Sequence, residues 1–313
     1  MSIQWQGVFP AVTTKLKPDF SLDLDAIRQG LERLIANGVG GVVMMGMVGE
    51  NAQLAPDEKL AVLRTAVETV RGRVPVVSGV AETGTARAAA FAQEAARIGV
   101  DGLMVFPGLT YKSDDRETIA FYRSVAQASP LPILLYNNPR GYGVDLTPDV
   151  VAELLQEPTI VAIKEESYDT TRVTDLITRF GDRLAVVCGV DDLVLESAAL
   201  GVTAWVSGMA NAVPKASVDL LRLAAEGDFV RARKLYAALT PLFHLDTVVK
   251  LVQHIKLAEH LITGSAETVK PPRLDLAGAE RERTLAITRQ TLADLATLCL
   301  LYTSDAADER SSV

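Results

Sequence analysis

Short apolar runs rich in β-branched residues recur along the chain, separated by segments whose apolar residues fall at helical spacing. The runs that we predict as strands are Gly7–Thr14, Gly41–Met45, Pro75–Val80, Gly102–Phe106, Leu131–Tyr136, Thr159–Lys164, Leu184–Cys188 and Thr203–Ser207. The segments that we predict as helices between them are Asp23–Asn37, Pro56–Val70, Thr85–Ile98, Asp115–Ala128, Thr147–Gln156, Tyr168–Phe180 and Leu193–Leu200. Runs this apolar are buried on both faces, as in a parallel sheet.

This alternation predicts an α/β fold of the closed (β/α)8, or TIM, barrel type, since eight β/α units occupy roughly 230 residues. An open doubly wound sheet is the alternative, and it typically has a GxGxxG loop after its first strand. Here the first run ends in Ala11-Val12-Thr13-Thr14-Lys15, which contains no such loop. We therefore assign residues 1–228 to a barrel domain.

The strand pattern stops near Asp228, and three helices are predicted after it, at Phe229–Leu242, Thr247–Ile262 and Glu280–Thr297. We expect residues 229–298 to form a helical extension that packs on the barrel or on a neighbouring subunit, without a core of its own. Residues 299–313 do not continue the helical pattern and look like the translated read-through of a sequencing adapter. We predict a non-native tail there; a natural polar tail is the alternative.

The composition excludes several classes of protein. The 313 residues are 49% hydrophobic with a net charge of -8, which suits a large core and argues against nucleic-acid binding. No apolar run approaches the roughly 18 residues of a membrane span, and the first residues do not resemble a signal peptide. We expect a cytoplasmic enzyme. Neither the two cysteines nor the three histidines have metal-ligand spacing, so we expect no metal and no cofactor.

Lys164 is the residue with the clearest chemical meaning, because it ends a buried apolar run, Thr159–Lys164. Burial removes the hydration of an ammonium group and lowers its pKa, and a neutral amine attacks carbonyl carbons. The alternative is a lysine that emerges from a strand and pairs with Glu165 or Glu166. Tyr136 ends the preceding strand, so we expect it beside Lys164, where a phenol can move protons during imine chemistry. A core tyrosine is its alternative role.

Active sites of such barrels lie at the carboxyl ends of the strands. Four further groups of candidate substrate-binding residues follow from this rule, and they are Thr13, the loop Gly46–Asn51, Gly189, and the pair Val206 and Ser207. Gly46 and Gly49 form a tight loop whose backbone N–H groups can bind an anion such as the carboxylate of a 2-oxo acid. Asn138 and Arg140, after the fifth strand, complete the candidates.

Together, Gly46-x-x-Gly49-Glu50, Tyr136-Asn137-x-Pro139 and Ile163-Lys164-Glu165 resemble the dihydrodipicolinate synthase/N-acetylneuraminate lyase family of class I, Schiff-base lyases. The resemblance covers nearly all of residues 4–298. It implies that Lys164 forms the imine with a small 2-oxo acid or imine substrate and that Tyr136 relays protons.

The resemblance also assigns binding roles. It implies that the loop of Gly46, Met47, Val48 and Gly49 binds the substrate carboxylate, and that Gly189 and Val206 form part of the pocket wall near the substrate. It further implies a homotetramer, a dimer of dimers, in which a tyrosine near the interface completes the relay. Tyr111 is the candidate for that tyrosine.

Two departures from the family pattern bear on the substrate. Met47 and Val48 stand where the family usually has a side-chain hydroxyl that binds the carboxylate. Dihydrodipicolinate synthases carry an arginine two residues after the proline of Tyr136-Asn137-x-Pro139. Here that position is Gly141, and Arg140 follows the proline directly, so a bidentate carboxylate contact shifts by one residue. This shift argues against lysine biosynthesis.

These departures favour another branch of the family. In Tyr136-Asn137-Asn138-Pro139 and His244-Leu245-Asp246, the sequence resembles the pyrroline-4-hydroxy-2-carboxylate deaminases. Our leading hypothesis is a deaminase and dehydratase that opens a cyclic imine on Lys164. The alternatives are a pyruvate-dependent aldolase or 4-hydroxy-tetrahydrodipicolinate synthase, a barrel that binds a metabolite without turnover, and a phosphate-binding barrel. We interpret His244-Leu245-Asp246 as a packing or interface segment.

Overall fold

The computed structural model describes residues 3–108 and 110–308, with residues 299–308 described only as helical backbone. Eight parallel strands form one sheet in the order β1-β8-β7-β6-β5-β4-β3-β2. The strands are β1 (Gly7–Pro10), β2 (Val42–Met44), β3 (Val76–Val80), β4 (Gly102–Val105), β5 (Ile133–Asn137), β6 (Ile160–Glu165), β7 (Ala185–Cys188) and β8 (Ala204–Ser207). Ala11 bridges to Val43, and the Val12 N–H donates to the Val43 carbonyl at 2.9 Å, which closes the sheet between β1 and β2. The predicted (β/α)8 barrel is confirmed.

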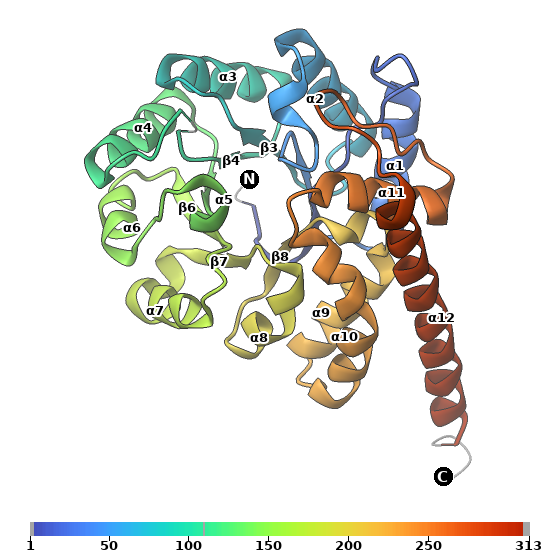
Figure 1. The fold of residues 1–313 in the computed structure, drawn as a ribbon. Helices are drawn as coiled ribbons and strands as arrows, with labels where there is room; N and C mark the ends of the chain where they lie inside the picture. The colour runs from blue at the N-terminus through green and yellow to red at the C-terminus, as the bar shows by residue number, and fades with distance from the viewer. Residues whose placement is uncertain (1–2, 109, 309–313) are drawn as a thin grey trace.

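Helices surround the strands, as Figure 1 shows. Those of the barrel are α1 (Leu24–Ala36), α2 (Pro56–Val70), α3 (Thr85–Ile98), α4 (Asp115–Ala128), α5 (Pro139–Tyr142), α6 (Pro148–Leu154), α7 (Thr170–Phe180), α8 (Val194–Ala199) and α9 (Pro214–Ala225). Short 3-10 turns occur at η1 (Asn51–Gln53), η2 (Gly181–Arg183), η3 (Asp191–Leu193) and η4 (Met209–Asn211). The sequence pattern did not predict α5. It begins at Pro139, a favourable first helical residue, and the Asn138 side chain accepts from Gly141 N at 2.8 Å.

The first strand is shorter than predicted, which moves the residues after it. β1 ends at Pro10, because the Ala11 N–H still bonds to Ser207 of β8 whereas the Val12 N–H bonds to Val43 of β2. The backbone crosses from one neighbouring strand to the other at this point. Thr13 therefore lies in an irregular segment rather than at a strand end.

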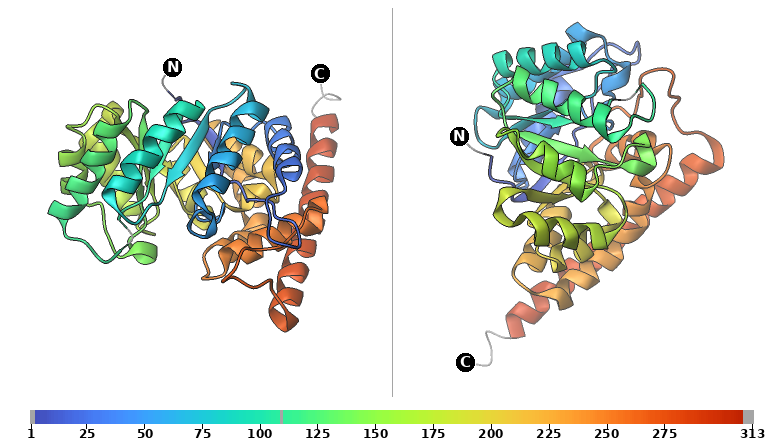
Figure 2. Two further views of the ribbon diagram at one scale, coloured as in Figure 1. Left: turned by 90° about the horizontal axis from the view of Figure 1, so that it is seen from above. Right: turned by 90° about the vertical axis from the view of Figure 1, so that its left-hand side faces the viewer.

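The extension consists of α10 (Phe229–Phe243), η5 (His244–Asp246), α11 (Leu251–Thr263) and α12 (Gly278–Asp308). Figure 2 shows α12 as a long helix along one side of the barrel. It continues past the predicted end at Thr297 into the segment 299–308 that the sequence sets apart as a tail. Buried residues of α10 and α11, such as Leu239 and Ile255, belong to the same apolar core as the strands. Within the described residues, no helix is long and apolar enough to cross a membrane.

Candidate active site

Lys164 and Tyr136 lie side by side near the carboxyl ends of two neighbouring strands. The register of β5 and β6 pairs the two residues directly. The Lys164 Nζ lies 4.0 Å from the centroid of the Tyr136 ring, and both residues are buried. Gly189, after β7, leaves room for the lysine, since a Cβ at that position would stand 2.9 Å from both Cγ and Cε of Lys164. The sequence expectation that the amine and the phenol converge is met by this geometry.

One carboxylate, that of Glu166, joins the amine to the phenol. Its Oε2 accepts hydrogen bonds from Lys164 Nζ at 2.6 Å and from the Tyr136 hydroxyl at 2.7 Å. Its Oε1 accepts from Asn138 Nδ2 at 2.8 Å. The sequence interpretation considered Glu166 only as a partner for a lysine leaving its strand. Residues two apart in extended chain share a face, which is the signal that places Glu166 with Lys164.

These contacts set the protonation of the resting site. Burial lowers the pKa of Lys164, but the charge and hydrogen bond of Glu166 outweigh burial, so that this pKa lies above its ordinary value. This result corrects the expectation of a lowered lysine pKa. Burial also raises the pKa of Tyr136 far above its usual value, and the nearby Glu166 carboxylate adds to that shift. The resting site therefore holds an ammonium group and a protonated phenol around one carboxylate.

The space in front of these groups is a small cavity of about 50 Å³, which suits a small substrate or a few water molecules. Its lining consists of Ala11, Gly46, Met47, Val48, Met104, Tyr136, Asn138, Lys164, Glu166, Gly189, Val206, Gly208, Asp246 and Leu251. Within the described part of the chain, the backbone N–H groups of Met47 and Val48 donate to no other residue. Two unused backbone donors in the cavity wall suit a carboxylate, although the loop has no side-chain hydroxyl.

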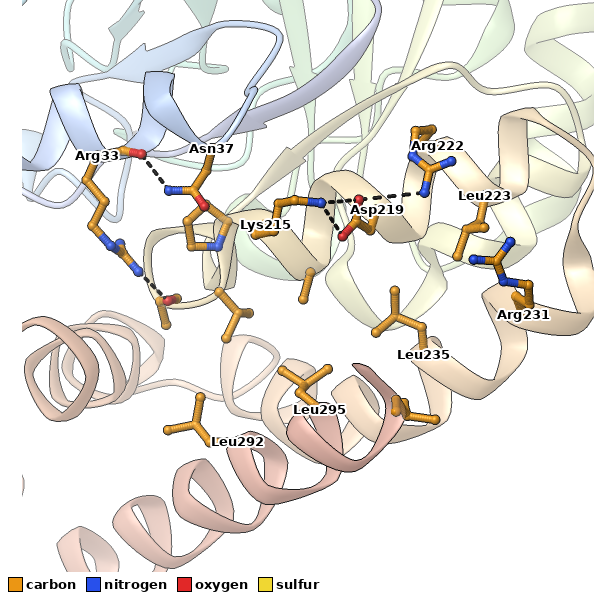
Figure 3. A pocket seen from close by; sticks show the side chains of 15 residues that line it. Arg33, Asn37, Lys215, Asp219, Arg222, Leu223, Arg231, Leu235, Leu292 and Leu295 are labelled. Atoms are coloured by element: carbon orange, nitrogen blue, oxygen red, sulfur yellow. Dashed lines mark hydrogen bonds and ion pairs between the residues drawn. The ribbon is translucent and has the colours of Figure 1, made fainter. Parts of the chain in front are cut away.

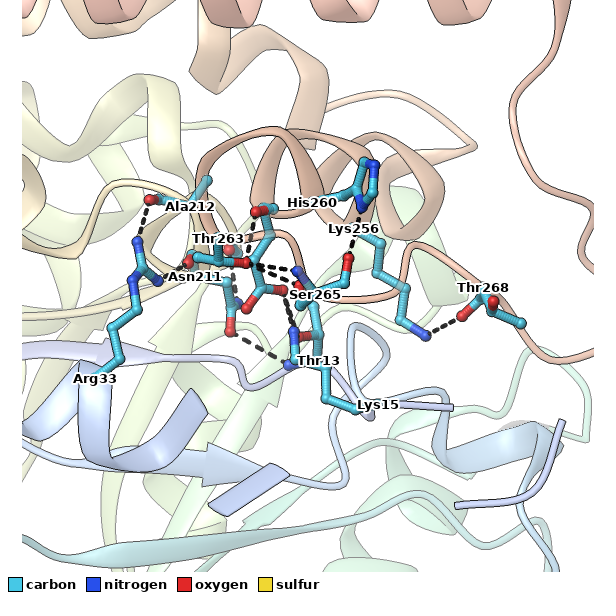
Figure 4. Close-up of polar contacts among 12 residues, drawn as sticks. Thr13, Lys15, Arg33, Asn211, Ala212, Lys256, His260, Thr263, Ser265 and Thr268 are labelled. Atoms are coloured by element: carbon cyan, nitrogen blue, oxygen red, sulfur yellow. Dashed lines mark hydrogen bonds and ion pairs between the residues drawn. The ribbon is translucent and has the colours of Figure 1, made fainter. Parts of the chain in front are cut away.

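Five other candidates from the sequence do not line this cavity. Thr13 donates from Oγ1 to Glu259 Oε2 at 2.7 Å and accepts from Lys15 Nζ at 2.7 Å, as Figure 4 shows for Thr13 and Lys15. This corrects its assignment as a strand-end residue that binds substrate, because the chain has already turned towards β2. Gly49 belongs to the loop after β2 but does not face the cavity, and its carbonyl accepts a hydrogen bond from Thr14 Oγ1 at 2.7 Å.

The remaining three candidates are engaged elsewhere. Ser207 donates from Oγ to Asp191 Oδ2 at 3.0 Å. Arg140 stacks on Tyr168, with its guanidinium carbon 4.2 Å from the ring centroid. Tyr111 is 60% exposed, and its hydroxyl donates to Glu117 at 2.8 Å. Within one chain, Tyr111 therefore does not join the relay of Tyr136.

Asp246 is a cavity residue that sequence reasoning assigned wrongly. It lies in η5 of the extension, yet its side chain lines the same cavity as Lys164. The interpretation of His244-Leu245-Asp246 as packing or interface holds for Leu245, which is buried in the core, but not for Asp246. Among the described residues, no group of three or more His, Cys, Asp and Glu side chains is arranged to hold a metal ion. The chemistry of this cavity is thus that of an amine, a phenol and carboxyl groups.

Comparisons with known proteins agree with this arrangement. The sequence profile of the Dihydrodipicolinate synthetase family matches residues 4–291. The chain is 39% identical over 239 residues to a 4-hydroxy-tetrahydrodipicolinate synthase of Methanothrix thermoacetophila, which covers 76% of this chain and 80% of that protein. It is 34% identical over 287 residues to the 4-hydroxy-tetrahydrodipicolinate synthase of Methanosphaerula palustris, covering 91% and 97%.

Solved structures show the same relationship. The 4-hydroxy-tetrahydrodipicolinate synthase of Methylacidiphilum fumariolicum SolV superposes with a TM-score of 0.91 at 28% identity, covering 95% of this chain and 99% of that one. YagE of E. coli K12, a member of the dihydrodipicolinic acid synthase family solved in complex with pyruvate, gives 0.86 at 29% identity, covering 92% and 98%. The chain therefore belongs to the dihydrodipicolinate synthetase family and is an enzyme of the class I lyase type found there.

Proposed function

We propose that this enzyme forms a Schiff base on Lys164 with a cyclic imine of a 2-oxo acid and then removes water and ammonia, as a pyrroline-4-hydroxy-2-carboxylate deaminase does. The observation that carries the proposal is the Glu166 carboxylate, which contacts both the Lys164 amine and the Tyr136 phenol. A carboxylate in this position can accept the ammonium proton and so free the amine as a nucleophile.

The charges in the cavity favour a single substrate with one carboxylate over a pair of substrates that each carry a carboxylate. Among the described residues that line it, Lys164 is the one cation, and Glu166 and Asp246 are acids. A synthase that joins pyruvate to a second carboxylate substrate needs another cation to bind that group. Arg140 is engaged with the Tyr168 ring outside the lining, so it does not fill this role here.

The proposed reaction uses each of these groups. The substrate carboxylate accepts from the Met47 and Val48 N–H groups, and the freed Lys164 amine attacks C2, so that the ring C2–N bond breaks and leaves an open-chain amine. Loss of a C3 proton gives an enamine, whose electron pair expels the C4 hydroxyl. Loss of a C5 proton gives a dienamine; protonation at C4 then forms an imine at C5, and protonation at C3 restores the imine on Lys164. Two hydrolyses then release ammonia and the 2-oxo acid semialdehyde and restore Lys164.

A second candidate is a pyruvate-dependent aldolase or 4-hydroxy-tetrahydrodipicolinate synthase. The observation that favours it is the name of the relatives at 39% and 34% identity. Both reactions begin with an imine on Lys164, so the two functions differ only in the steps after imine formation. Release of ammonia from the cyclic imine supports the first, and condensation of pyruvate with an aldehyde supports the second.

Trapping with borohydride tests the shared step. Incubation with pyruvate and borohydride should add the mass of the reduced pyruvate adduct to the peptide that contains Lys164. Lys164→Arg is the matched control, because it keeps a cation next to Glu166 but forms no imine. If the parent protein gains no such mass, or gains it on another lysine, the proposed function is wrong.

We also propose that the enzyme acts in the cytoplasm as a homotetramer, a dimer of dimers, as the family resemblance implies. The exposed ring of Tyr111 is available at the surface to meet a neighbouring subunit. Light scattering tests the assembly, and a mass near that of one 33.6 kDa chain would contradict it.

A further inference from the structure

Asp246 approaches the reaction centre from outside the barrel. It belongs to η5, which follows α10, and its side chain lines the cavity together with Lys164 and Glu166. Gly208, just after β8, makes room for it, since a Cβ at position 208 would stand 2.7 Å from Asp246 Oδ1. The missing side chain at residue 208 thus admits a carboxyl group to the cavity.

A second carboxyl group, that of Asp191, is held behind Asp246 in a fixed orientation. Asp191 is 1% exposed. Its Oδ1 accepts from Trp205 Nε1 at 2.9 Å, and its Oδ2 accepts from Ser207 Oγ at 3.0 Å and from the Met209 N–H at 2.9 Å. Three donors directed at one carboxyl group stabilise its charged form.

The two buried carboxyl groups interact strongly enough that each affects the pKa of the other, and two such neighbours are most stable when one of them carries a proton. Because the donors from Trp205, Ser207 and Met209 stabilise charge on Asp191, the proton belongs on Asp246. Burial raises the pKa of Asp246 well above its usual range, and the negative charges of Asp191 and Glu166 raise it further. The titratable groups that act on Asp246 or are affected by it are Asp191, Glu166, Lys164, Tyr136 and Tyr168.

The other acidic groups of the cavity are less suited to protonate a leaving group. Glu166 accepts hydrogen bonds from Lys164, Tyr136 and Asn138, so its oxygens are committed as acceptors. The Tyr136 hydroxyl donates a hydrogen bond to Glu166, so its proton is directed at that carboxylate. Asp246 is thus the acid of the lining whose strongest charge interaction is with another carboxyl group, Asp191, rather than with the amine or the phenol.

Building on the proposed function, we propose that Asp246 is the general acid that protonates the leaving C4 hydroxyl, with Asp191 as the group that holds its proton in place. In this step the C4–O bond breaks, its electron pair stays on oxygen, and the Asp246 proton converts the leaving group to water. The enamine electron pair forms the C3=C4 double bond. Asp246 then takes a proton from C5, which produces the dienamine and restores the protonated pair.

The test separates imine formation from elimination. Asp246→Asn keeps the shape of the side chain and can still donate to Asp191, but it has no acidic proton. With pyruvate, exchange of methyl protons for deuterium reports the imine and enamine steps, and it should stay within about twofold of the parent. Ammonia release from 4-hydroxy-1-pyrroline-2-carboxylate should fall by about 100-fold or more, the usual contribution of a general acid.

Asp192→Asn is the matched control. Asp192 is adjacent to Asp191 in the chain, lies 3.6 Å from His244 and is outside the cavity lining, so its substitution should change neither rate. Retention of ammonia release within threefold in Asp246→Asn would overturn the acid role while leaving the proposed function intact. Equal loss of exchange and of ammonia release in Asp246→Asn would show a positioning role and overturn it as well. A parent that exchanges pyruvate protons but releases no ammonia would instead overturn the deaminase assignment.

Discussion

The ammonium group of Lys164 shows how a neighbouring residue can reverse the effect of burial. Desolvation alone lowers the pKa of a buried lysine, and this was the basis of the sequence argument. The structure adds the Glu166 carboxylate at 2.6 Å, which raises the pKa of Lys164 above its ordinary value. The resting lysine is therefore charged, and the residue that keeps it charged is also placed to accept its proton.

Glu166→Gln should move the pH dependence of imine formation to lower pH. Removing the negative charge leaves burial as the dominant effect on Lys164, so its pKa falls and the neutral amine becomes available at lower pH. The measurement is the initial rate of borohydride trapping with pyruvate at a series of pH values.

Glu165→Gln is the control for this series. The Glu165 side chain points away from the cavity and accepts from Asn137 Nδ2 at 2.9 Å and from the Ser167 N–H at 2.6 Å. Its substitution should leave the inflection where the parent has it. An inflection for Glu166→Gln at or above that of the parent would show that Glu166 does not govern the protonation of Lys164.

The sequence predicts some site residues and not others for a physical reason. Tyr136 and Lys164 end consecutive strands, and parallel strands bring such ends together, so their proximity follows from the pattern alone. Asp246 comes from a short turn between two helices of the extension, where no periodicity tells which side chain faces the barrel. Its position depends on the packing of the extension and on the space at Gly208.

At the scale of elements, the eight strands were predictable because each is a short run buried on both faces. Their ends were less so: the pattern continued the first strand to Thr14, whereas β1 ends at Pro10. Ala11 and Val12 are buried like strand residues, but beyond Pro10 the pairing continues as an isolated bridge from Ala11 to Val43. Likewise α11 begins at Leu251 rather than at Thr247, because the chain first turns through η5.

A buried ion pair fastens α11 to the loop after β2. Glu50 and Lys256 form this pair, and both side chains are fully buried. Glu50 Oε1 also accepts from the Lys270 N–H at 2.7 Å, and Lys256 Nζ donates to the Thr268 carbonyl at 2.7 Å. Figure 4 shows Lys256 reaching towards Thr268. The extension thereby supports the loop Gly46–Glu50, whose first three residues line the cavity.

Breaking this pair should be costly. Lys256→Met leaves the Glu50 carboxylate buried without its cation, and we expect a loss of about 3–5 kcal/mol in the free energy of unfolding. The double variant Glu50→Gln/Lys256→Met should lose clearly less than the sum of the two single variants, since residues in contact are coupled. Urea denaturation followed by circular dichroism measures these values.

An exposed pair provides the comparison. Lys215 and Asp219 form an ion pair one turn apart on α9, and the lysine side chain is 65% exposed. Lys215→Met should cost about 1 kcal/mol or less. Losses of similar size for Lys256→Met and Lys215→Met would mean that the buried pair does not fasten α11 to the barrel.

At the scale of the whole molecule, the last helix closes the extension against the barrel. α12 lies along α10, and a groove of about 370 Å³ remains between α9, α10 and α12. Figure 3 shows Leu292 and Leu295 of α12 directed towards this groove, with Leu235 of α10 on the other side. Leu298 is the last described side chain of α12 that lines it. The match to the family ends earlier, at residue 291.

Two truncations therefore separate what α12 contributes from what the segment 299–313 contributes. A chain ending at Leu298 keeps the apolar contacts of the groove, so its melting temperature and its trapping of pyruvate should equal those of the parent. A chain ending at Thr291 loses Leu292, Leu295 and Leu298, all of them half-buried, and should be less stable by about 3 kcal/mol, at roughly 1 kcal/mol for each leucine. Thermal unfolding measures both. If the chain ending at Leu298 is destabilised as much as the chain ending at Thr291, then the segment 299–308 stabilises the fold. The interpretation of residues 299–313 as a dispensable tail would then be wrong.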